Sequence, residues 1–196
     1  MRTRHLTLAL PLVCSAVALM PSSIRAQSFL YTNFSNPTGL QINGNAFAPA
    51  TGENGTSQVL RLTSATDSQA GSAFSLSPVQ LGDNASFSTA FSFQLWDGGG
   101  ISDGTGNQAG ADGLVFVLNT VSNTVGSSGQ GVGYQGINNS VGVKFDTWDD
   151  SAGSFPQDND PNGNFVAIYA DGSTHMYDPD LSDNTASYNN YADDAH

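Results

Sequence analysis

The sequence predicts an all-β protein, a sandwich or jelly roll of antiparallel sheets, and three observations support this. The chain is rich in Gly, Ser, Thr, Asn, Phe and Val and poor in Leu, Lys and Glu, which favours strands and turns over helices. Short apolar or alternating runs recur along it, with turn residues between them. We find no heptad pattern and no internal repeat, so neither a coiled coil nor a repeat architecture is indicated.

The first 26 residues resemble a secretory signal peptide. Basic residues precede the apolar run Leu6–Met20, and the small residue Ala26 stands before Gln27, as at a signal cleavage site. We therefore expect a secreted or extracytoplasmic protein. The alternative, a membrane anchor, fits less well because the run is short for a span, so no membrane insertion is expected.

The mature chain is strongly acidic. Only Arg61 and Lys144 among the basic residues lie beyond residue 26, whereas all seventeen Asp and Glu residues do, so the net charge is about −15. Such a surface repels nucleic acid and anionic membranes. The single cysteine, Cys14, lies in the signal peptide, so a large core, a bound metal ion or both must stabilise the fold.

Residues 27–196 are enough for one domain with a sizeable core. The runs that we expect to form strands are Ser28–Tyr31, Leu40–Ile42, Val59–Thr63, Gly71–Leu76, Pro78–Leu81, Phe87–Leu95, Gly113–Leu118, Val141–Asp146 and Phe165–Tyr169. Beyond Asp171 the pattern decays, which indicates either an acidic tail or a domain that lacks its last strands.

Two of these strands set the position of the candidate site. Gly113–Leu118 is apolar on both faces, which predicts a central strand of a buried sheet. In Val141–Asp146 the alternation puts Val141, Val143 and Phe145 on one face, expected to lie in the core. Lys144 and Asp146 then share the opposite face.

A dense cluster of carboxylates follows this strand, at Asp149, Asp150, Asp158 and Asp160. Such a cluster predicts a hard cation, calcium above all. The segment from Asp158 imitates part of an EF-hand loop, but Tyr169 stands where that loop needs its glutamate and flanking helices are not expected. The alternative is a solvated acidic loop.

Two further motifs precede the strand. Gly131–Gly136 is a literal GxGxxG, but another strand follows it instead of a helix, so a loop that brings backbone N–H groups close to a ligand fits better than a dinucleotide site. Asp112 stands at the mouth of the 113–118 strand between small residues. It is either accessible to a ligand in a cleft or an ordinary turn aspartate.

Catalysis is not expected. Glu53 is the only glutamate, whereas sandwich glycosidases use a closely spaced pair of carboxylic acids. His175 and His196 are the only mature histidines and suggest no nucleophile–base arrangement. A hydrolase built on two aspartates remains a minor alternative.

Taken together, three segments in order resemble the legume-type (L-type) lectin family, whose members are jelly-roll sandwiches that bind carbohydrate. They are Ala111–Leu118, the glycine loop Gly131–Gly136, and Val141–Asp150 with Asp160–Pro161 and Phe165–Ile168. The similarity runs from about Phe29 to Ile168. It implies a glycan partner and no catalysis.

The resemblance also implies the site residues. Asp112, preceded by a cis peptide bond, would accept hydrogen bonds from sugar hydroxyls, and the Gly133 N–H would donate to the same sugar. Calcium would be held by Asp146, the Trp148 carbonyl, Asp150 and Asp160. At Asp150 the family normally has asparagine, whose nitrogen also donates to sugar, so we expect calcium binding to survive better than sugar affinity.

Plant members hold a transition metal beside calcium, through a glutamate at the position of Lys144 and a histidine at that of Phe165. Neither is present, so we expect this second metal site to be lost and the Lys144 ammonium to pair with Asp146 and Asp160. The alternative is that Lys144 reaches solvent.

Family members also continue with further strands. The leading function is thus a calcium-dependent lectin domain, and the second a structural or adhesive sandwich that has lost sugar binding.

Overall fold

The structure is a computed structural model that describes residues 29–81, 84, 86–96, 98, 110–121, 123–149, 162–174 and the backbone of 188–190. The expected signal peptide and the loop carrying Asp150 and Asp160 lie outside these residues. Among those described, no helix is long and apolar enough to cross a membrane.

The described chain is built from short strands and one 3₁₀ turn. The elements are β1 (Leu40–Gly44), β2 (Phe47–Thr51), β3 (Gln58–Arg61), β4 (Gly71–Ser75), β5 (Gly113–Asn119), η1 (Gly129–Gly131), β6 (Ser140–Asp146), β7 (Phe165–Ala170) and β8 (Tyr188–Asn190). This confirms the all-β class.

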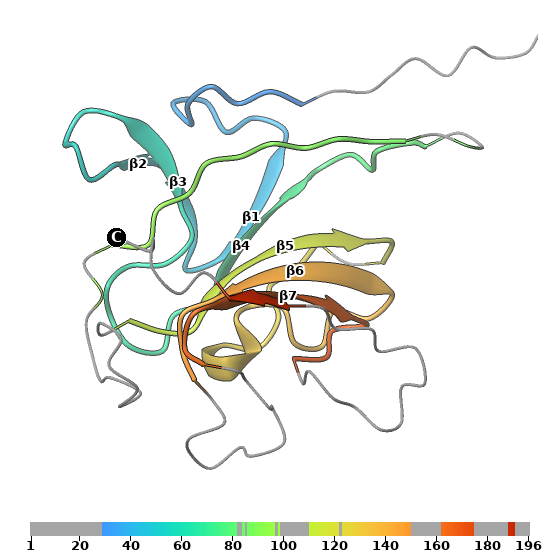
Figure 1. The fold of residues 1–196 in the computed structure, drawn as a ribbon. Coiled ribbons are helices and arrows are strands. Elements are labelled where there is room, and N and C mark those ends of the chain that lie inside the picture. The colour runs from blue at the N-terminus through green and yellow to red at the C-terminus, as the bar shows by residue number, and fades with distance from the viewer. Residues whose placement is uncertain are drawn as a thin grey trace, which may run out of the picture.

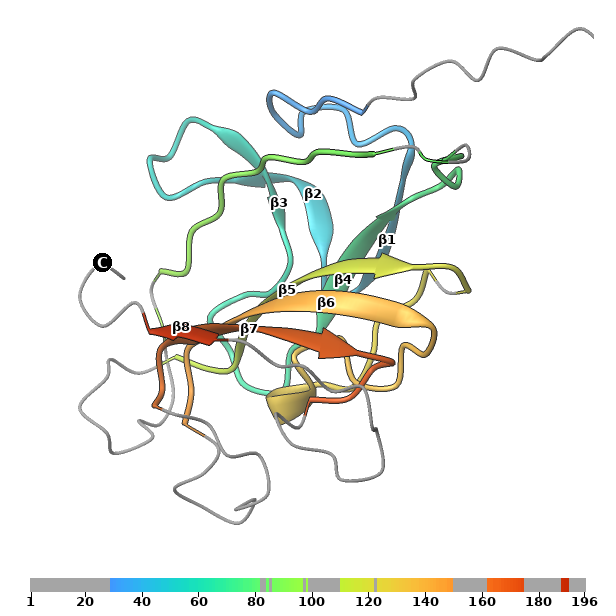
Figure 2. The same cartoon turned by 45° about the vertical axis from the view of Figure 1, so that its right-hand side comes forward.

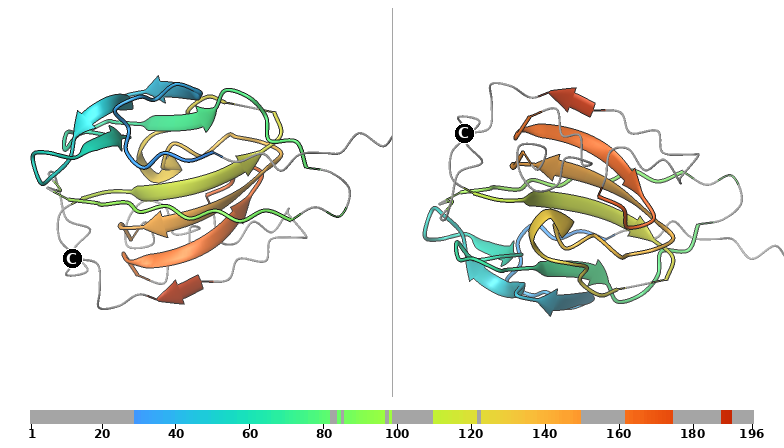
Figure 3. Two further views of the ribbon diagram at one scale, coloured as in Figure 1. Left: turned by 90° about the horizontal axis from the view of Figure 1, so that it is seen from above. Right: turned by 90° about the horizontal axis from the view of Figure 1, so that it is seen from below.

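Every strand pairing among the described residues is antiparallel. β1 pairs with β4, β2 pairs with β3, and β5, β6, β7 and β8 form a four-stranded sheet in that order. The two pairs lie to one side of the larger sheet, as Figures 1 and 2 show. The views from above and below separate these two layers (Figure 3).

Six of the nine expected strands coincide with observed ones: β1, β3, β4, β5, β6 and β7. Residues 29–31, 78–81 and 87–95 form no strand, so those three predictions are wrong. β2 and β8 were not expected. The prediction that Gly113–Leu118 is a central strand is also wrong, because β5 pairs only with β6 in the described sheet and so lies at its edge.

The β5–β7 sheet has two faces of different character, set by the register of its strands. One face, here called the inner face, carries Val115 and Val117 of β5, Gly142, Lys144 and Asp146 of β6, and Phe165, Ala167 and Tyr169 of β7. The other, the outer face, carries Leu114, Phe116, Leu118, Val141, Val143, Phe145, Val166 and Ile168.

The inner face is the buried one, which reverses our prediction for Val141, Val143 and Phe145. On β6, Gly142, Lys144 and Asp146 are buried, whereas Val141 on the outer face is 48 % exposed. Alternation shows that the two faces differ but not which one is covered. The charged residues can lie inside because they compensate each other, as described below.

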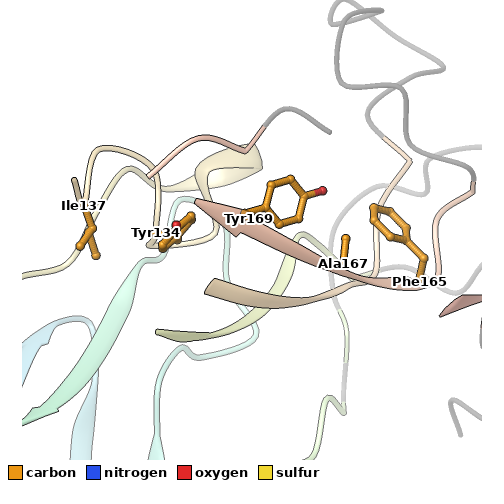
Figure 4. Close-up of a cluster of buried hydrophobic side chains, with 5 residues drawn as sticks. All are labelled: Tyr134, Ile137, Phe165, Ala167 and Tyr169. Carbon is orange, nitrogen blue, oxygen red and sulfur yellow. The ribbon is translucent and has the colours of Figure 1, made fainter. Parts of the chain in front are cut away.

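The core of the described chain lies against this inner face. Tyr134 and Ile137, from the loop after η1, pack with Phe165, Ala167 and Tyr169, and Val115 and Val117 line the cluster (Figure 4). Gly142 makes room for it, because a Cβ there would lie 3.1 Å from the Tyr134 ring. The loop that carries the glycine motif is therefore part of the core.

Candidate functional site

The candidate site begins where β5 starts and β6 ends. Gly113 is paired with Asp146, and the Thr147 N–H donates to the Asp112 carbonyl at 3.2 Å. The Ala111–Asp112 peptide bond is cis, as the resemblance implied. A Cβ at Gly113 would overlap the Phe145 carbonyl oxygen, so glycine lets β5 approach β6 directly after Asp112. The start of β5 and the end of β6 thus bring Asp112 and Asp146 together at one end of these two strands.

Lys144 and Asp146 form an ion pair inside the protein. The Lys144 Nζ contacts Asp146 Oδ2, and the two residues are 1 % and 2 % exposed. The alternative that Lys144 reaches solvent is therefore excluded. The other carboxylate oxygen, Asp146 Oδ1, accepts a hydrogen bond from the Trp148 N–H at 2.8 Å. Both oxygens of Asp146 are thereby oriented by neighbours two residues away.

Two aromatic rings complete the surroundings of Lys144. Its Nζ lies 5.9 Å from the centre of the Phe165 ring and 5.7 Å from that of Tyr169. In the β6–β7 register Lys144 is opposite Ala167, whose small side chain leaves the space between the rings open. A desolvated ammonium gains about 2 kcal/mol from such a ring face.

The described part of the site contains two carboxyl groups, of Asp112 and Asp146, and one ammonium group, of Lys144. Burial raises the pKa of Asp146 to about 6, against the opposing effects of Lys144 and the Trp148 N–H. Burial also raises the pKa of Asp112, again opposed by the charge of Lys144. The described part of the site thus places two carboxyl groups beside one ammonium, and a further bound cation would favour the ionised form of both carboxyl groups.

The glycine loop is closed by its own hydrogen bonds. The Gly133 N–H donates to the Ser127 carbonyl at 2.8 Å, and the Gly126 N–H donates to the Gly133 carbonyl at 2.7 Å. Gly133 itself has φ +69° and lies beside Val125 and Gly71. Its N–H is thus already engaged, unlike the bare N–H groups that we expected in this loop.

Tyr134 anchors this loop to the sheet. Its hydroxyl is hydrogen-bonded to that of Ser140 at 2.9 Å and accepts from the Gly172 N–H at 3.1 Å. Ser140 also donates to the Ile137 carbonyl. One buried hydroxyl therefore connects the loop, the start of β6 and the turn after β7.

The structure unites some of the expected site residues. Asp112, Lys144 and Asp146 meet where β5 begins and β6 ends, and the Trp148 N–H contacts Asp146. Asp150 and Asp160 lie outside the described residues. Within the described residues, the candidate site included, no three His, Cys, Asp or Glu side chains gather in a metal-binding arrangement. Sequence reasoning missed Tyr169, which the alternation of β7 could have placed beside Lys144, and the anchoring role of Tyr134.

Comparison with known proteins identifies the class. The model of the legume lectin domain matches residues 26–189, so the chain belongs to the legume lectin family. The fold of that family is a jelly-roll β-sandwich, in agreement with the all-antiparallel strands found here. As a class these domains bind carbohydrate without catalysis. No individually curated protein matches the chain.

Proposed function

We propose that this protein is a secreted lectin domain that binds glycans in a calcium-dependent manner. The observation that carries the proposal is the cluster formed by the buried pair of Lys144 and Asp146 and the partly exposed Asp112, where β5 begins and β6 ends. A purely structural sandwich gains nothing from a buried ion pair with a second carboxylate beside it, because each buried charge costs desolvation free energy. A site that binds a cation and a polar ligand accounts for them.

The residues present fit calcium. Asp146 Oδ2 is buried and, within the described chain, accepts no hydrogen bond in addition to its ion pair, so a lone pair is available. In the proposal the calcium ligands are Asp146, the Trp148 carbonyl, Asp150 and Asp160, all oxygen donors of the kind calcium takes. Bound calcium would neutralise carboxylate charge at this site.

Asp112 is the proposed sugar acceptor. It is partly exposed, whereas Asp146 beside it is buried. Its carboxylate can therefore accept hydrogen bonds from the hydroxyl groups of a sugar that approaches from solvent. The bond from the Thr147 N–H to its carbonyl fixes its backbone relative to β6. An ionised carboxylate accepts hydrogen bonds about twice as strong as those of a neutral group.

Gly133 and Asp150 complete the proposed sugar contacts, with a restriction on each. The Gly133 N–H can donate fully to a sugar only when it releases the Ser127 carbonyl. Asp150 supplies an acceptor and no donor at a position where the family normally has an amide. These two features favour a second candidate function, a structural or adhesive sandwich without sugar binding.

A glycan array on the secreted chain separates the two candidates. The protein is applied in calcium, then in EDTA, then with calcium restored. The proposal expects binding to a defined group of glycans that EDTA abolishes and calcium restores. Absence of binding in all three conditions favours the structural sandwich, and binding that EDTA leaves unchanged contradicts the role of calcium.

A further inference from the structure

We propose that the Lys144 ammonium takes the place of the transition-metal ion that legume lectins typically hold beside calcium, so that this domain binds calcium as its single metal ion. The inference rests on the proposed calcium site and adds a positioning role for a residue of this chain. It is carried by the burial of Lys144, its ion pair with Asp146 and the aromatic residues around it.

Lys144 is not a surface lysine whose charge happens to lie near Asp146. It is 1 % exposed, and a buried ammonium is tolerated only where charge and packing compensate its desolvation. Here the compensation comes from the Asp146 carboxylate and from the faces of Phe165 and Tyr169. The inner face of the sheet thus has a buried position that suits one cation, and the Lys144 ammonium occupies it.

The side chains around the Lys144 ammonium do not suit a transition-metal ion. Such ions take imidazole, thiolate and carboxylate ligands, whereas the β7 residues that face Lys144 are Phe165, Ala167 and Tyr169. Phe165 stands directly opposite Asp146 and offers a ring instead of an imidazole. Asp146 is the carboxylate that contacts the ammonium, and neither of the two rings near it offers an imidazole or a thiolate.

A second metal ion cannot share the position of the ammonium. Nζ contacts Asp146 Oδ2 and lies near the rings of Phe165 and Tyr169, and the ammonium charge would repel a metal ion at that same position. The lysine therefore does two things that a second metal ion would do: it neutralises one carboxylate charge and holds the Asp146 carboxylate in one orientation. With Oδ1 bonded to the Trp148 N–H, that orientation is fixed before calcium binds.

The first test measures metal content. Protein stripped with EDTA is equilibrated with calcium and manganese together, freed of unbound ions, and analysed by mass spectrometry and by electron paramagnetic resonance of manganese. The proposal expects bound calcium and no stoichiometric manganese. Stoichiometric manganese beside calcium, or zinc in a parallel experiment, overturns it.

The second test exchanges the lysine for a metal ligand. The double variant Lys144→Glu with Phe165→His replaces the ammonium with a carboxylate and an imidazole, and it should bind manganese and melt at a higher temperature when manganese is added. The matched variant Lys144→Met with Phe165→His removes the charge without restoring the carboxylate. It should be destabilised and should show a smaller manganese response.

These variants distinguish charge replacement from a merely structural lysine. A lysine that only packs predicts that both variants lose stability alike, without rescue by manganese, and that result contradicts the proposal. A glutamate variant that stays unfolded in manganese contradicts it as well. Glycan binding is not part of either readout, so failure of the proposed lectin function is seen separately on the glycan array.

Discussion

At the scale of single residues, Asp112 predicts how sugar binding depends on pH. Burial raises its pKa, so the carboxylate protonates at a higher pH than the usual value near 4. Protonation removes the charged acceptor, and glycan affinity should therefore fall on acidification before ordinary aspartates titrate. Affinity measured over a pH series in saturating calcium, with bound calcium monitored, checks this. An affinity that stays constant down to a pH of about 4 contradicts it.

Asp150 predicts a gain of affinity. The variant Asp150→Asn keeps an oxygen ligand for calcium and adds an N–H donor for sugar. One added hydrogen bond is worth roughly 0.5–1.5 kcal/mol, so glycan affinity should rise about two- to twelvefold. Asp149→Asn changes the neighbouring carboxylate, to which no ligand role is assigned, and is the matched control. Equal effects of the two variants would show that net charge alone is responsible.

At the scale of elements, the hydroxyl of Tyr134 predicts the stability of the glycine loop. The variant Tyr134→Phe leaves the Gly172 N–H without its buried acceptor, which should lower the free energy of unfolding by about 1–3 kcal/mol. Chemical denaturation measures this.

The control for Tyr134 is Tyr31→Phe. The Tyr31 hydroxyl donates to the Thr38 carbonyl at an exposed position, where water replaces the bond, so stability should change by about 0.5 kcal/mol or less. A Tyr134 variant that is no less stable than the Tyr31 variant would mean that the loop is held by its backbone hydrogen bonds alone.

The sequence predicted a strand correctly where an apolar or alternating run also pairs with a neighbouring strand in the fold. β5, β6 and β7 carry long apolar or alternating runs, and all three were located. β2 was missed because Pro49 interrupts a short run, and the strand tolerates it with a cis bond and an irregular register. Residues 87–95 alternate clearly yet form no ladder. Their Phe91 and Phe93 rings instead pack against Phe116 and Phe145 on the outer face.

The charged residues of the site could be predicted from the sequence, but the segments that cover them could not. Alternation placed Lys144 and Asp146 on the same side of β6, and the ion pair confirms it. The same alternation could not tell that this side is covered by the loop carrying Tyr134, a contact distant along the chain. The bond from the Gly133 N–H to Ser127 likewise depends on how the loop closes, which spacing does not specify.

At the scale of the whole molecule, the excess of acidic residues predicts a stabilising effect of calcium beyond simple screening. A formal net charge of −12 opposes the compact state, and any salt reduces this repulsion. A specific site adds more: calcium at about 100 times its Kd contributes about 2.7 kcal/mol.

Thermal unfolding in calcium chloride and in sodium chloride of equal ionic strength separates the two effects. The melting temperature should be clearly higher in calcium chloride, and EDTA should return it to the sodium chloride value. Equal melting temperatures in the two salts would mean that calcium acts only by screening.

The most direct test of the account compares the wild type with Asp112→Asn on one glycan identified by the array. Binding of both proteins is measured in calcium and in EDTA, with calcium content determined in parallel. We expect the wild type to bind only in calcium, and Asp112→Asn to hold calcium equally well but to lose most of its glycan affinity. Undiminished binding by Asp112→Asn, or wild-type binding that persists in EDTA, would contradict it.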